Sequence, residues 1–162
     1  MKSYAFDGKK HFDALLAIVD EMEDLYNNAP CGYHSLSKDG IVLRMNDTEL
    51  AWLGYARGEV IGKMRYFDFL TAESRSRSVG TYSSFLKDGY LKDLEFQCVS
   101  KQGALYSILV NCTAHYDADG NFVSSRSTVV DITALREKER EVSRLLATIG
   151  GNDHADTSDH DL

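Results

Sequence analysis

Apolar side chains recur at alternating steps of three and four residues near the start of the chain. Five of them fall on one stripe of a predicted helix over residues 11–26: Phe12, Leu15, Val19, Met22 and Tyr26. The segment 27–30 ends in the single proline of the chain and predicts the end of this helix. The stripe can pack on the domain itself or on a second copy of the chain.

Alternation of apolar and polar positions predicts five strands farther along. Residues 32–36 and 41–45 form a first pair around the turn at Asp39-Gly40. A meander of three longer strands follows, over residues 91–100, 104–116 and 122–130. Their regular alternation indicates that each strand has one face toward a core.

Short helical segments separate the two groups of strands. Asn46 is the predicted N-cap of a helix that begins near Thr48 and ends at Gly54. Thr71 is the predicted N-cap of a longer helix over 72–88. This order of elements predicts a single α+β domain with an antiparallel sheet.

The last strand leads directly into a charged helix predicted over 134–150. A heptad frame, interrupted by Glu139, puts these apolar residues at a and d positions: Ile132, Leu135, Val142, Leu146 and Ile149. Gly150-Gly151 is expected to stop the helix, and the acidic tail 151–162 is expected to be disordered. Such a helix has little reason to fold alone, so it is expected to need a partner surface.

Composition narrows the function classes. The 162 residues suit one domain, and 43% hydrophobic with 27% charged residues is typical of a globular protein. A net charge of −7 argues against a nucleic-acid partner. We find no apolar stretch that could span a membrane and no signal peptide. Three widely spaced cysteines favour a reducing, cytoplasmic location.

Several motifs in the right order resemble the PAS domain family. They are the stretches NAPCGYHSLSKDG and DADGNFVSSRSTVVDIT, and a run matched by Asn46, Leu53, Gly54, Tyr55, Glu59, Val60, Ile61, Gly62 and Lys63. The resemblance covers residues 25 to 133. It divides the chain into an N-terminal amphipathic helix (1–28), a PAS-like domain (29–133), a coiled-coil-like signalling helix (134–150) and the tail (151–162).

The resemblance implies a five-stranded antiparallel sheet with short helices on one face, flanked by amphipathic N- and C-terminal helices. It also implies a sensory role, with a small-molecule ligand in the cavity or a dimer contact as the input. The state would pass to an effector through the helix that follows Asp131, Ile132 and Thr133. A homodimer would use the flanking helices, through Phe12, Leu15, Val19, Met22, Leu135, Val142, Leu146 and Ile149.

Eight residues are candidates for the lining of a ligand pocket between helices and sheet: Trp52, Phe67, Phe69, Tyr82, Phe85, Phe96, Val110 and Cys112. The alternative is that they simply fill the core. Five serines at positions 74–84 lie on the helix over 72–88 and, with Arg75 and Arg77, either meet an anionic ligand or form a solvated face.

The sequence contains few residues that indicate a cofactor site or a catalytic site. A flavin photoreceptor of this family needs a cysteine after Gly62-Lys63, where the sequence has none, and the helix over 72–88 lacks the histidine expected of a haem binder. His34 and His115 are expected at the surface or at an edge. No cofactor or metal site is predicted, and the absence of a catalytic motif predicts that these residues form no enzyme.

The leading hypothesis is a sensory and dimerisation module of a histidine kinase or diguanylate cyclase type protein. Two alternatives stay open at this point. The first is a haem- or flavin-carrying redox or light sensor, and the second is a stand-alone interaction adaptor without a ligand. The sequence does not identify the effector.

Overall fold

An antiparallel sheet of five strands forms the centre of the molecule. The computed structural model describes residues 8–152. The strands are β1 (Gly32–Leu36), β2 (Val42–Met45), β3 (Tyr90–Val99), β4 (Leu105–Tyr116) and β5 (Phe122–Asp131). Their order in space is β2-β1-β5-β4-β3, so β1 pairs with the last strand as well as with its hairpin partner. The predicted sheet is confirmed.

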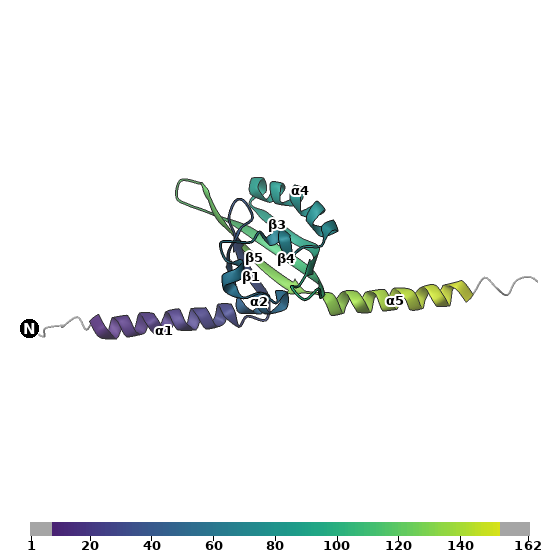
Figure 1. Cartoon of the computed structure of the whole chain (residues 1–162), viewed down its shortest axis with the longest axis horizontal. Helices are drawn as coiled ribbons and strands as arrows, with labels where there is room; N and C mark the ends of the chain where they lie inside the picture. Colours follow the sequence, from purple (N-terminus) through teal and green to yellow (C-terminus); the bar gives the residue numbers. More distant parts are fainter. Residues whose placement is uncertain (1–7, 153–162) are drawn as a thin grey trace, which may run out of the picture.

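Helices cover one face of this sheet (Figure 1). They are α2 (Asp47–Leu53), α3 (Arg57–Val60), the 3₁₀ helix η1 (Tyr66–Phe69) and α4 (Ala72–Asp88). Strands and helices bury a continuous core between them, to which Val42, Leu53 and Val60 contribute side chains with almost no exposure. This arrangement confirms the α+β architecture.

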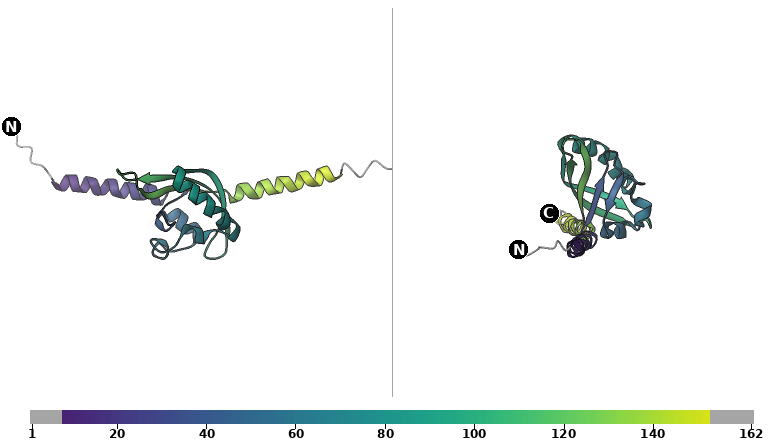
Figure 2. Two further views of the ribbon diagram at one scale, coloured as in Figure 1. Left: turned by 90° about the horizontal axis from the view of Figure 1, so that it is seen from above. Right: turned by 90° about the vertical axis from the view of Figure 1, so that its left-hand side faces the viewer.

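The flanking helices extend away from the domain in opposite directions (Figures 1 and 2). They are α1 (Gly8–Asn27) and α5 (Thr133–Asn152). No residue of α1 is buried. Among the described side chains of α5, all except Thr133 and Arg136 are exposed. The isolated chain therefore leaves both helices without a packing partner over most of their length.

Two boundaries of the C-terminal helix differ from the prediction. The helix α5 begins at Thr133 and passes through Gly150-Gly151 to end at Asn152. Glycine in a helix interior costs only about 1 kcal/mol relative to alanine, so a glycine pair disfavours a helix without forbidding it. Residues 153–162 of the predicted disordered tail lie outside the described part of the chain.

Asn46 connects α1, the first hairpin and α2. It is the N-cap of α2, because its Oδ1 accepts from the backbone N–H of Glu49 at 3.1 Å. The same oxygen accepts from the N–H of Tyr33 at 3.0 Å, while Nδ2 donates to the carbonyls of Tyr26 and Cys31 at 2.9 Å each. Every hydrogen-bonding position of this fully buried amide is thus filled, and the end of α1 is held against the domain.

The edge of β3 that pairs with no other strand is hydrogen-bonded to the N-cap and the first turns of α4. The N–H of Gln97 donates to Ser74 Oγ at 2.8 Å, and the guanidinium of Arg77 donates to the carbonyl of Glu95 at 2.8 Å. The N–H of Thr71 donates to the carbonyl of Gln97 at 2.9 Å. These bonds satisfy backbone groups that an edge strand would otherwise present to another chain.

Candidate functional site

A small cavity lies between the inner face of the sheet and the helices. His34 of β1, Ser127 of β5 and Cys112 of β4 are directly opposed in register, so their side chains share the inner face and form its polar wall. The cavity measures about 40 Å³. A water molecule takes about 30 Å³ in the liquid, so this space suits water rather than a metabolite.

The structure brings only part of the predicted pocket together. Around the cavity lie Phe67, Tyr82, Phe96, Val110 and Cys112. Phe69 and Phe85 are instead buried within the core, with 1% and 0% exposure. Trp52 lines a different small space, together with Glu49, Cys98 and Tyr106. Aromatic side chains thus occupy much of the volume in which the sequence placed a ligand.

The prediction for His34 was wrong. Its side chain is 2% exposed, and Nδ1 lies 3.0 and 3.1 Å from the two carboxylate oxygens of Glu49. The reason is strand parity: residues two apart point to the same face, so His34 shares the core face with Leu36. That alternation was the available signal. Its imidazole also stacks on the ring of Tyr66, with centroids 4.0 Å apart.

Gly32 makes room for the buried carboxylate. A Cβ built on Gly32 would lie 3.0 Å from Cδ of Glu49, closer than ordinary packing allows. Glu49 sits in the first turn of α2, where backbone N–H groups favour a negative side chain. A buried carboxylate is tolerated when it is fully hydrogen-bonded, and His34 supplies that partner.

The groups around Glu49 are kept protonated. Burial, followed by the charge of Glu49, raises the pKa of Tyr66 well above its ordinary value, and interactions of the Tyr66 hydroxyl with Glu49 and with the Cys98 thiol raise it further. Burial, again followed by Glu49, raises the pKa of Cys98 to about 12. A buried neutral thiol is a poor nucleophile, so Cys98 is a structural residue at neutral pH.

Only some of the serines of α4 lie on a solvated face. Ser74 and Ser78 are buried, and their hydroxyls are hydrogen-bonded: Ser74 Oγ accepts from β3, and Ser78 Oγ donates to the carbonyl of Arg75 at 2.8 Å. Ser76, Ser83 and Ser84 are exposed. The spacing of four between the two buried serines matches one helical turn facing the sheet.

The interior does not fit a flavin or a haem. Sites for molecules of that size usually measure about 300–1,000 Å³, far above the space between sheet and helices. His34 is the one histidine beside the cavity, and its Nδ1 is engaged by Glu49. Within residues 8–152, no group of three His, Cys, Asp or Glu side chains is arranged to hold a metal ion.

The exit from the sheet into α5 is tied to the neighbouring strand. The carboxylate of Asp131 accepts from the N–H of Thr133 at 2.8 Å, and Thr133 Oγ1 accepts from the N–H of Ser107 at 3.0 Å. The N–H of Ile132 donates to the carbonyl of Ser107 at 2.8 Å. The three predicted relay residues therefore attach the first turn of α5 to β4.

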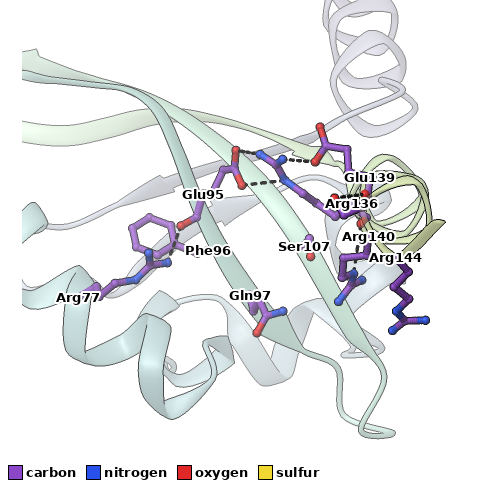
Figure 3. A pocket seen from close by; sticks show the side chains of 10 residues that line it. Arg77, Glu95, Phe96, Gln97, Ser107, Arg136, Glu139, Arg140 and Arg144 are labelled. Carbon is purple, nitrogen blue, oxygen red and sulfur yellow. Dashed lines mark hydrogen bonds and ion pairs between the residues drawn. The ribbon is translucent and has the colours of Figure 1, made fainter. Parts of the chain in front are cut away.

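Arg136 adds a charged contact one turn later (Figure 3). Its guanidinium pairs with the carboxylates of Glu95 on β3 and Glu139 on α5, and its Nε lies 3.0 Å from Glu95 Oε2. Sequence reasoning missed this contact because Glu95 and Arg136 are 41 positions apart. The pair is partly exposed, so its contribution to stability is modest.

The residues predicted for a dimer interface are exposed on the two flanking helices. On α1, Phe12, Leu15, Val19 and Met22 expose 49–66% of their surface. On α5, Leu135, Val142, Leu146 and Ile149 expose 53–66%. Apolar faces of this extent are uncommon on the surface of a monomeric protein.

The sequence profile of the PAS domain family matches residues 30–134, which is most of the chain. The chain therefore belongs to the PAS domain family, and its core is a sensory domain. None of the described helices is long and apolar enough to cross a membrane.

Solved structures agree with this fold. The PAS domain of an HTR-like protein from Haloarcula marismortui superposes with a TM-score of 0.62 at 22% identity, over 76% of this chain and 99% of that one. A PAS domain from a two-component sensor histidine kinase gives 0.59 at 14% identity, over 72% and 98%. An RNA-binding light-oxygen-voltage receptor gives 0.67 at 12% identity, over 91% of this chain and 40% of the receptor.

A curated relative is similar in sequence over part of its length. It is a 2,3-bisphosphoglycerate-independent phosphoglycerate mutase from Anaplasma marginale, 27% identical over 135 residues. The match covers 83% of this chain, which spans about a quarter (26%) of the mutase. A partial match at this identity does not transfer the mutase activity.

Proposed function

We propose that this chain is the sensory and dimerisation module of a cytoplasmic signal-transduction protein of the histidine kinase or diguanylate cyclase type. The carrying observation is the exit helix, whose first turn is bonded to the sheet while its apolar seam faces solvent. A change in the core or at the dimer contact would alter the position of α5, and α5 would carry that change to an effector.

Two features of the sensory core support this reading. The His34–Glu49 pair lies on β1 and α2, next to the strand β5 that continues into α5. Val129 pairs with Gly32 of β1, Ile108 pairs with Asp131 at the exit, and both are packed with almost no exposure. Close-packed side chains transmit small displacements because they cannot be compressed.

The dimer would be formed by α1 and α5 together. Their apolar residues would cover each other across a two-fold axis, as closed homodimers require. Glu139 at an a position of the seam weakens the pairing, which suits a contact that changes between states rather than a permanent one.

Sedimentation velocity of the full chain tests this proposal. Wild type is expected to be a dimer, and the double variant Leu135→Asp/Val142→Asp a monomer, because two buried charges would face each other in the seam. The control is Thr148→Asp on the same helix, which adds a charge at an exposed polar position outside the seam. It should stay dimeric.

Amide hydrogen exchange of the same proteins measures how much dimerisation protects the backbone of α5. The helix should exchange faster in the double variant than in wild type, since an unpartnered helix is marginal in water. A monomeric wild type, or a double variant that remains dimeric with slow exchange in α5, would contradict the proposal.

A further inference from the structure

A groove of about 600 Å³ lies along the edge of β3, between α4 and α5 (Figure 3). Its wall on the α4 side carries Arg77, and its wall on the α5 side carries Arg136, Arg140 and Arg144. The floor is made by β3 and β4. The volume falls within the range of about 300–1,000 Å³ that small-molecule sites usually have.

The charges in the groove do not cancel. Its two carboxylates, Glu95 and Glu139, are both engaged by Arg136. Across residues 8–152, no carboxylate lies within ion-pair distance of the other three arginines. Four arginines against two glutamates leave a net charge of +2 in a chain whose total is −7. The groove therefore favours an anion.

Two of these arginines are already partly held in place. Arg77 donates to the carbonyl of Glu95, and its guanidinium carbon lies 5.7 Å from the centre of the Phe96 ring. Nε of Arg140 donates to the carbonyl of Arg136 at 3.2 Å. Prior ordering lowers the entropy lost when a ligand binds. The side chains of Gln97 and Ser107 add neutral donors between the two walls.

We propose that this groove binds a phosphate-bearing anion of nucleotide size. Guanidinium groups match phosphate oxygens with paired hydrogen bonds, and three guanidinium groups without a carboxylate partner call for a ligand with more than one negative charge. A single carboxylate would balance only half of the net charge of +2.

The groove borders the apolar seam of α5. Leu135, Val142 and Leu146 do not line the groove, whereas Glu139, at an a position of the seam, belongs to both surfaces. The consequence for signalling rests on the proposed function: a ligand that joins Arg77 on α4 to Arg140 on α5 would fix the exit helix against the sensory core. Calorimetry measures binding and sedimentation measures dimerisation, so failure of one proposal is distinguishable from failure of the other.

Isothermal titration calorimetry of the full chain tests the groove, with inorganic pyrophosphate and ATP as probes at low salt. Both should bind, ATP at least as well as pyrophosphate. Arg140→Glu and Arg144→Glu should each weaken binding about tenfold, the effect of losing one charge-assisted contact. The control Lys138→Glu makes the same charge change on α5 outside the groove and should alter affinity by about twofold at most.

Three outcomes would overturn the proposal. The first is no binding of either probe at low salt by a folded wild-type chain. The second is an equal loss in Lys138→Glu and Arg140→Glu, which would make the attraction a property of the whole surface. The third is binding of a single-stranded RNA with a steep salt dependence while neither small probe binds, which would mark a surface for a polymer.

Discussion

Replacing Asn46 by alanine should destabilise the domain more than the loss of an ordinary helix cap. The side chain is fully buried and makes four hydrogen bonds, two as acceptor and two as donor. Loss of the cap on α2 costs about 1 kcal/mol. Loss of the other three bonds leaves partly buried backbone groups of Tyr26, Cys31 and Tyr33 without a partner, which costs about 1 kcal/mol each. The expected total is about 4 kcal/mol.

Urea unfolding followed by the fluorescence of Trp52, the only tryptophan, measures this loss. The matched control is Thr71→Ala, which removes the N-cap of α4 but only one bond, from the N–H of Ser74 at 3.3 Å. It should cost about 1 kcal/mol. If Asn46→Ala cost no more than Thr71→Ala, the role assigned to Asn46 as a link between α1, β1 and α2 would be refuted.

Two further predictions concern a turn and a thiol. Gly40 has φ +79° and a built Cβ would lie 2.6 Å from the ring of Phe67, so Gly40→Ala should cost about 1–3 kcal/mol in urea unfolding. Gly103→Ala, with φ +87° and open space, should cost about 1 kcal/mol, and equal costs would exclude the Phe67 clash. The raised pKa of Cys98, about 12 against an ordinary 9.0, keeps its proton on the folded chain while the unfolded chain loses it. Stability from this thiol is therefore complete below about pH 9 and falls between about 9 and 12. From pH 8 to pH 10, wild type should lose about 1 kcal/mol more than Cys98→Ala, and parallel losses would contradict this.

The elements of the fold were predictable because each depends on a short stretch of sequence. The 3-and-4 spacing in α1 and α5 and the alternation in β3, β4 and β5 are written within ten to twenty residues. Thr71 and Asn46 were recognisable as caps for the same reason, since a cap acts on backbone groups three residues away. The prediction that Gly150-Gly151 ends the last helix was wrong, because glycine in a helix interior costs only about 1 kcal/mol relative to alanine.

The candidate site was less predictable because its contacts join distant segments. His34 meets Glu49 across 15 positions, and Arg136 meets Glu95 across 41. Local composition makes a histidine on a short strand and a glutamate on a short helix look like surface residues. Only the burial of both elements against the same core makes their pairing necessary.

By itself, the sequence determined the family, the order of the elements and the apolar faces of the two flanking helices. Tertiary structure alone decided that β1 inserts beside β5, that aromatic side chains reduce the interior to a cavity of about 40 Å³, and that four arginines line one groove. The physical reason is the range of the forces. Backbone hydrogen bonding and periodicity act between near neighbours, whereas burial and charge pairing depend on which remote residues the strand register brings together.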